Sequence, residues 1–172
     1  MLSQKVINIK LLCVLFFIAS CSVSQTQQAY WEANMSVGIS EWDQGDIEQG
    51  EKDLLRALWR ARNYRGPYEV AVSLYEIGRR YNRINSRIEE GASMLEEALS
   101  IQRNIKNPDR KFTGRILGEL AGSYYALGQI KDKNYIEKGK PLINELKDLV
   151  NLYSGQERTY LNKLFALYEK ES

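Results

Sequence analysis

The chain has 172 residues, of which 44% are hydrophobic and 27% are charged, and its 24 basic and 22 acidic side chains leave a net charge of +2. This composition is typical of a globular domain and argues against a disordered or membrane-embedded chain. The sequence has no histidine, which removes the commonest general base and zinc ligand, and a nearly neutral protein has little reason to bind nucleic acid.

Residues 1–20 are expected to be a signal peptide. Lys5 and Lys10 give a positive start, and an unbroken apolar run over residues 11–18 is too short to span a membrane as a mature helix. Two small residues then precede Cys21, and the segment Ile18-Ala-Ser-Cys21 resembles the lipobox of bacterial lipoproteins. The resemblance implies cleavage before Cys21, a diacylglycerol on its thiol and acylation of the new amine.

An acylated Cys21 would hold the protein on a membrane, since two or more chains give stable attachment. By resemblance to Gram-negative sorting rules, Ser22 implies the periplasmic side of the outer membrane. The alternatives are an ordinary signal peptide in which Cys21 is incidental, or an uncleaved anchor. Cys13 would leave with the signal peptide, so the mature domain has no thiol for a disulfide or metal. It would carry 22 basic and 22 acidic side chains.

Residues 21–27 are expected to be a lipidated tether. Ser22 to Gln27 is small and polar, and it reaches at most about 20 Å when fully extended. The helical domain, residues 28–172, should therefore lie close to the bilayer.

The first helical hairpin is expected over residues 28–65. Asp46 is its predicted internal N-cap, with Gln49 three residues on. Gly50, Leu54 and Ala57 then place a small, a large and a small residue on one helical face.

The second hairpin is expected over residues 66–106, opened by Gly66-Pro67 with proline at the first helical position. Its first helix carries a large–large–small–aromatic pattern. Ser86-Arg-Ile-Glu89 predicts a capping box. The helix after it repeats the small–large–small triplet. The pattern of the first helix consists of Leu74, Ile77, Gly78 and Tyr81. The triplet of the second helix consists of Gly91, Leu95 and Ala98.

The third hairpin is expected over residues 107–153, with Asn107-Pro108 as N-cap and first helical residue. An enlarged turn is predicted at residues 131–134, and Pro141 is expected in the first turn of the following helix. A closing helix over residues 154–170 is predicted to begin with a Ser154–Glu157 capping box. The two apolar patterns recur as Leu117, Leu120, Ala121 and Tyr124, and, weakened, as Gly139, Ile143 and Leu146.

These repeated patterns are similar to those of tetratricopeptide repeats. The interval is longer than the family's basic unit of about 34 residues: Gly38 to Gly78 is 40 residues and Gly78 to Ala121 is 43. Longer units are found in kinesin-light-chain-like repeats. The resemblance implies an all-α fold, a short right-handed α-solenoid of about three hairpins with a C-terminal capping helix. The alternative is an unrelated helical bundle with glycines at its tight contacts.

In this family the first helix of each hairpin lines the concave face, which implies a protein-binding surface here. The residues so placed are Met35, Ile39, Trp42, Tyr75, Arg79, Asn82, Arg83, Arg115, Gly118, Gly122 and Tyr125. Among the three tryptophans, Trp42 is the one expected to be exposed.

Two features of this surface have competing interpretations. Gly114, Gly118 and Gly122 recur every four residues, either because a partner lies on the bare backbone or because another helix of this chain packs there; we favour the second. Arg79, Arg83 and Arg87 also recur every four residues. They could bind an acidic segment of a partner or anionic lipid head groups, or simply pair with nearby glutamates.

The sequence favours a binding protein over an enzyme. It shows no catalytic motif, and we expect neither a cofactor nor a metal. The resemblance implies a membrane-anchored periplasmic adaptor that holds another envelope protein, as pilotin-like and outer-membrane-assembly lipoproteins do. The alternative is a structural lipoprotein of the outer membrane that associates with its own copies. The sequence leaves the partner, the pathway and the oligomeric state open.

Overall fold

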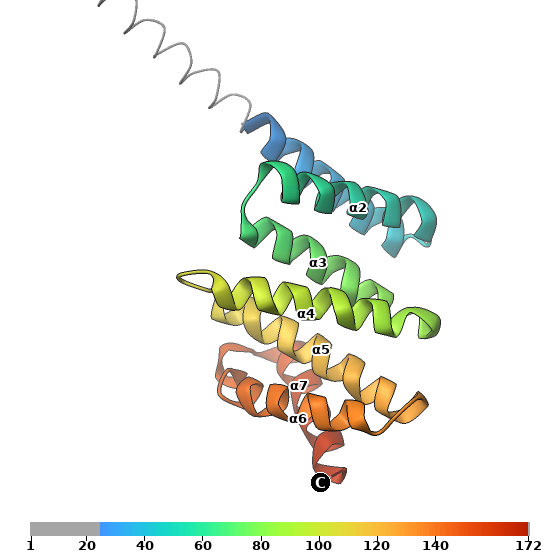
Figure 1. Ribbon diagram of the computed structural model, residues 1–172, viewed down its shortest axis with the longest axis vertical. Helices are drawn as coiled ribbons and strands as arrows, with labels where there is room; N and C mark the ends of the chain where they lie inside the picture. The colour runs from blue at the N-terminus through green and yellow to red at the C-terminus, as the bar shows by residue number, and fades with distance from the viewer. Residues whose placement is uncertain (1–24, 172) are drawn as a thin grey trace, which may run out of the picture. The chain divides into compact units, whose positions relative to one another are not determined.

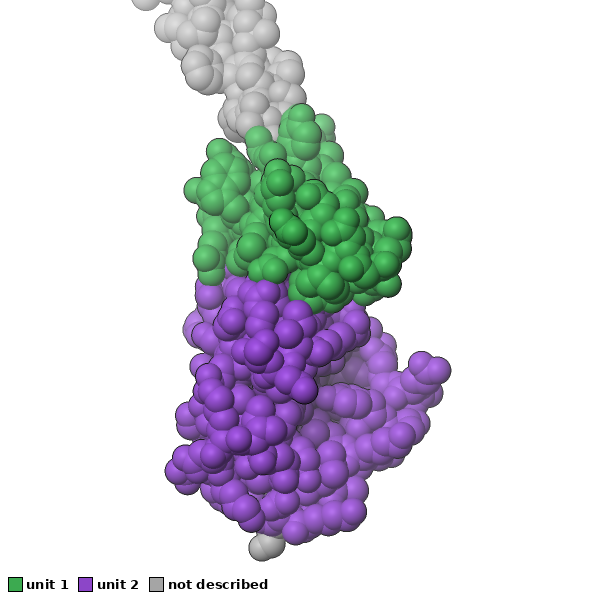
Figure 2. Space-filling view, turned by 90° about the vertical axis from the view of Figure 1, so that its right-hand side faces the viewer, with its two compact units in different colours: residues 1–65 green, residues 66–172 purple. Residues whose placement is uncertain are grey.

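The structure is a computed structural model that describes residues 25–171 (Figure 1). The described residues form helices and turns and contain no strand, which confirms the expected all-α fold of helical hairpins. The chain divides between Arg65 and Gly66 into two compact units, unit 1 (residues 1–65) and unit 2 (residues 66–172), coloured separately in Figure 2.

Unit 1 contains a single described hairpin. Residues 25–43 are helical, and α2 spans Ile47–Tyr64. Between them Gly45 takes a φ of +95°, which favours glycine. The backbone N–H of Gln49 donates to Asp46 Oδ1 at 3.2 Å, which confirms the predicted N-cap.

Glycines let the two helices of unit 1 approach closely. A Cβ added at Gly38 would lie 2.9 Å from the Gly50 carbonyl oxygen and 2.9 Å from Leu54 Cγ. One added at Gly50 would lie 2.7 Å from the Trp42 nitrogen. The predicted small–large contact therefore forms, and Leu54 is fully buried.

The prediction that Trp42 is exposed is wrong. Its side chain is 6% exposed, because the backbone of Gly50 admits the last turn of the preceding helix against α2. Trp59 is the exposed tryptophan, at 55%.

Unit 2 consists of helices that pack in chain order, α3 on α4, α4 on α5 and α5 on α6, with α7 against α5 and α6 (Figure 1). Its elements are α3 (Pro67–Tyr81), η1 (Asn85–Arg87), α4 (Ile88–Asn104), α5 (Arg110–Ile130), α6 (Asn134–Lys147), η2 (Val150–Leu152) and α7 (Gly155–Lys170).

The small-to-large contact of unit 1 recurs between α3 and α4. A Cβ on Gly78 would lie 2.9 Å from both the Gly91 carbonyl oxygen and Leu95 Cγ. Leu95 and Ala98 are fully buried. In the third hairpin the helix face at Gly139 is instead covered by the hydroxyl of Tyr168 from α7, which donates to the Ala121 carbonyl oxygen at 2.8 Å.

Two predicted helix starts are wrong, by one residue for α4 and by two for α5. Ser86 lies in η1, and α4 begins at Ile88 without a side-chain cap. The N-cap of α5 is Asp109 rather than Asn107, since Asp109 Oδ1 accepts from the N–H groups of Lys111 and Phe112 at 2.9 and 3.0 Å.

Pro141 does not lie in a first turn. The turn at residues 131–133 ends earlier than expected, so α6 starts at Asn134 and Pro141 is in its interior. The side chain is exposed, and the carbonyl of Glu137, which would accept a bond from this position, is left without that donor.

The last helix begins at the predicted place but without the predicted capping box. Ser154 is the N-cap of α7 and makes no side-chain cap bond. The carboxylate of Glu157, the expected return partner, pairs with Arg115 of α5 instead.

Candidate functional site

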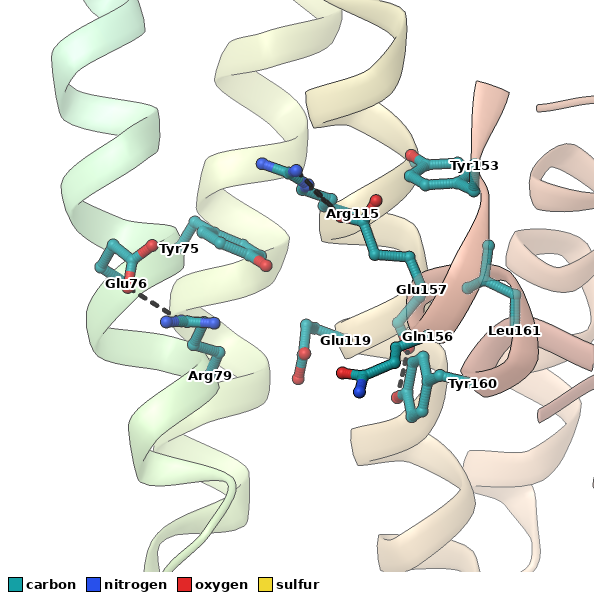
Figure 3. Close-up of a pocket in the computed structure, with 12 residues that line it drawn as sticks. Tyr75, Glu76, Arg79, Arg115, Glu119, Tyr153, Gln156, Glu157, Tyr160 and Leu161 are labelled. Carbon is teal, nitrogen blue, oxygen red and sulfur yellow. Dashed lines mark hydrogen bonds and ion pairs between the residues drawn. The ribbon is translucent and has the colours of Figure 1, made fainter. Parts of the chain in front are cut away.

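A cavity of about 490 Å³ in unit 2 is walled by α3, α5, α7 and the segment just before α7 (Figure 3). Aromatic, charged and glycine residues share this lining. They are Tyr75, Glu76, Arg79, Gly114, Arg115, Gly118, Glu119, Tyr153, Gln156, Glu157, Tyr160 and Leu161.

A second cavity, of about 330 Å³, adjoins the first, since Arg79, Glu119 and Tyr160 line both. All eight residues of unit 2 that were predicted to bind a partner line one or both cavities. Tyr75, Arg79, Arg115 and Gly118 line the larger, and Arg79, Asn82, Arg83, Gly122 and Tyr125 line the smaller. We call the two cavities together the groove.

The remaining predicted binding residues belong elsewhere. Met35 and Trp42 are buried in unit 1, and Ile39 is half-buried there. The predicted lipidation site, Cys21, lies outside the described residues, as do residues 1–20 and the first part of the tether. Residues 25–27, also assigned to the tether, are helical.

Most charges in the larger cavity are already paired within the protein. Arg79 Nε donates to Glu76 Oε2 at 2.8 Å, and the same carboxylate pairs with Arg80. Arg115 donates to Glu157 Oε1 at 3.0 Å through Nε. Lys111 lies 3.5 Å from the other Glu157 oxygen.

The regular arginine spacing is therefore partly accounted for by internal pairs. Arg79 pairs with Glu76, and Arg87 pairs with Glu90 at 2.9 Å while its guanidinium lies 3.5 Å from the ring centre of Tyr81. Arg83 is the exposed member of the three and lines the smaller cavity.

Glu119 is the charged residue of the groove whose side chain makes no hydrogen bond or ion pair with any described residue. It is half-buried and points into the cavity (Figure 3). Burial raises the pKa of its carboxyl; the charges of Arg79 and Arg83 lower it, and that of Glu76 raises it again. A cationic group entering the groove would satisfy this carboxylate.

Tyrosines supply the amphipathic surface of the groove. Burial, followed by the charge of Glu119, raises the pKa of Tyr75 to about 12, so its hydroxyl stays protonated at neutral pH. Tyr160 is 44% exposed, and its hydroxyl donates to the Gly118 carbonyl oxygen at 3.4 Å. Rings of this kind present an apolar face together with a polar tip.

The glycine stripe of α5 is covered by the protein's own chain, which confirms the favoured interpretation. Added Cβ atoms would meet Tyr153 at Gly114, Leu161 at 3.1 Å from Gly118, and the Tyr160 hydroxyl at 2.9 Å from Gly122. The glycine stripe is therefore the surface of α5 on which α7 and the segment before it pack.

Sequence reasoning missed the contribution of α7 because it treated this helix only as a cap. The helix repeats the pattern of the first helices of the hairpins: Leu161, Leu164 and Tyr168 follow Leu117, Leu120 and Tyr124 at an interval of 44 residues. That register would have identified α7 as a further helix of the array, but 44 residues after Arg115, Gly118 and Gly122 it reaches Thr159, Asn162 and Ala166, and so it does not find Glu157 or Tyr160.

Stability should depend on the ionisation of Glu119. Because its folded-state pKa is raised, the folded protein holds the proton more tightly, and stability falls as the pH rises through that pKa. The Glu119→Gln side chain cannot ionise. The free energy of unfolding of this variant should therefore equal that of the wild type below about pH 4, and exceed it by an amount that grows to a plateau above the folded-state pKa of Glu119. Urea denaturation across this pH range measures the difference, and one that is constant or opposite in sign would refute the assignment.

Within residues 25–171 no group of three or more acidic or thiol side chains is arranged to hold a metal ion. None of the described helices has the length and apolar character needed to cross a bilayer. In comparisons with known proteins, no family model matches the chain and no curated protein shows significant sequence similarity to it.

Proposed function

We propose that this protein is a membrane-anchored, periplasmic adaptor lipoprotein that holds a segment of another envelope protein in the groove of unit 2. The observation that carries the proposal is the convergence of all eight binding residues expected in this unit on two adjoining cavities. A groove lined by tyrosine and arginine suits a protein partner, because these side chains are frequent anchors at interfaces. We assign it no catalytic role.

The chemistry of the groove favours a partner segment with a basic side chain. In the larger cavity Glu76 and Glu157 already bind arginines, whereas the carboxylate of Glu119 has no hydrogen-bond or ion-pair partner among the described residues. A lysine or arginine of the partner would pair with Glu119 between the rings of Tyr75 and Tyr160. An acidic segment, the partner expected from the arginine spacing, suits only the smaller cavity, where Arg83 is exposed.

Membrane attachment through Cys21 is the second part of the proposal. Its support is the order of a basic start, an apolar run and Ile18-Ala-Ser-Cys21 in the sequence. Mass spectrometry of the N-terminal peptide tests it directly. We expect a cysteine at the first position with the mass of a diacylglycerol and a further acyl chain, and an unmodified Cys21 would contradict the anchor.

Partner capture is tested by photo-cross-linking in intact cells. A photoreactive amino acid at Gln156, an exposed residue on the rim of the larger cavity, should give cross-links to a different protein. The same group at Ser93, an exposed residue of α4 outside the groove, is the matched control and should give none. Cross-links only to copies of this chain would instead support the self-associating structural lipoprotein.

Glu119→Gln, made in the Gln156 reporter, tests the chemistry of the occupant. The variant keeps the shape of the side chain but removes its charge, so the yield of the heterologous cross-link should fall about tenfold if a charge-assisted contact is lost. An unchanged yield would rule out the pairing with Glu119 and leave the groove itself intact as the binding surface.

A further inference from the structure

Three aromatic side chains of unit 1 are exposed to solvent. Tyr30, Trp59 and Tyr64 are 51%, 55% and 50% exposed, and the rings of Trp59 and Tyr64 meet edge to face with centroids 5.6 Å apart. A contiguous exposed apolar patch marks an interaction surface, whereas apolar side chains exposed singly do not.

The hairpin brings these residues to the end of unit 1 from which the chain leads back to Cys21. Arg60 Nη1 donates to Gln27 Oε1 at 3.1 Å, and its guanidinium lies 4.8 Å from the ring centre of Tyr30. The last turns of α2 therefore lie beside the start of the described helix over residues 25–43 (Figure 1).

Charge is polarised along the same hairpin. The last ten residues of unit 1, 56–65, contain four arginines and no acid, whereas residues 41–53, around the turn, contain six acids and Lys52. The 18 residues of α2 are about 27 Å long, more than three times the screening length of roughly 8 Å at physiological salt. A negatively charged surface touching the arginine end would barely act on the acidic end.

We propose that the end of unit 1 carrying Tyr30, Trp59, Tyr64 and Arg62 lies on the anionic head-group layer of the bilayer. The proposal rests on the lipid anchor proposed above, because only three residues lie between Cys21 and Gln25, and the four steps along the chain reach at most about 14 Å. Tyrosine and tryptophan concentrate at membrane interfaces, and arginine stems lie along apolar surface while their charges reach the phosphates. The hairpin then stands with its acidic turn away from the membrane.

Tryptophan quenching by lipid tests this surface. Full-length acylated protein is reconstituted into vesicles of phosphatidylethanolamine and phosphatidylglycerol that carry bromine near the head group. Trp59 should be strongly quenched, because Trp42 is buried and Trp31 half-buried. Most of the quenching should disappear in Trp59→Phe. Equal quenching of the two proteins, or none in the wild type, would overturn the proposal.

A pair of charge reversals gives a matched comparison. Arg62→Glu, at the aromatic end, should lower the quenching about twofold or more in these anionic vesicles, whereas Lys52→Glu, at the acidic end, should leave it unchanged. Both positions are exposed, and helical circular dichroism verifies folding. Equal effects of the two substitutions would contradict the proposed orientation. The anchor and the groove are measured separately, by the N-terminal mass and by cross-linking at Gln156.

Discussion

Glu76→Gln is expected to destabilise unit 2 by about 3 kcal/mol. The Arg80 side chain is completely buried and pairs with the Glu76 carboxylate, whose own side chain is 16% exposed. Removing the carboxylate charge leaves a buried guanidinium without that counter-ion, which costs far more than an exposed ion pair contributes. The 2.8 Å bond from Arg79 to Glu76 loses its charged acceptor as well. The midpoint and slope of urea denaturation measure the change.

Glu90→Gln is the matched control for this prediction. Glu90 pairs with Arg87 at 2.9 Å and is three residues from it, as Glu76 is from Arg79, but its side chain is 55% exposed. An exposed pair contributes at most about 1 kcal/mol, so this variant should remain close to the wild type. If Glu76→Gln and Glu90→Gln lose similar amounts of stability, the burial of Arg80 does not determine the destabilisation.

Gly78→Ala is expected to destabilise unit 2 by about 2 kcal/mol. Alanine favours the helix by about 1 kcal/mol over glycine, but here its Cβ would lie 2.9 Å from the backbone oxygen of Gly91. Backbone cannot rotate away as a side chain does, so α3 and α4 must separate, and overpacking of this kind costs roughly 1–3 kcal/mol. Thermal and urea denaturation both report the loss.

Gly122→Ala provides the comparison within the same class of substitution. Its Cβ would meet only the hydroxyl of Tyr160, at 2.9 Å, and that ring can turn aside. The helical preference for alanine should therefore make this variant neutral or slightly more stable. If Gly78→Ala is as stable as Gly122→Ala, the close approach of α3 and α4 is not required.

The helix pairs could be predicted from sequence because their contacts are local and repeated. Gly78 and Gly91 are 13 residues apart, and the same pairing of Gly38 with Gly50 spans 12. A pattern recurring at such short range identifies both partners. The starts of α4 and α5 were missed because a capping motif competes with alternatives of similar energy, and Asp109 satisfies two N–H groups that Asn107 cannot reach.

The groove could be predicted only in part. Residues of α3 and α5 follow from the repeat register, whereas the pairs that complete the site join positions 42 residues apart, as Arg115 with Glu157 and Gly118 with Tyr160. No short-range pattern specifies such a pair. The tryptophans show the same limit, since Trp42 is buried by a glycine on another helix and not by its own neighbours.

Phe165 stands where the two preceding first helices have Gly78 and Ala121. Gly78 admits the backbone of α4, but a phenyl ring leaves no such room, and Lys147 already lies 5.8 Å from its centre. A further hairpin could therefore not pack on α7 through the contact that joins α3 to α4. Duplication of a hairpin before α7 would lengthen the surface available to a partner and leave this last helix unchanged.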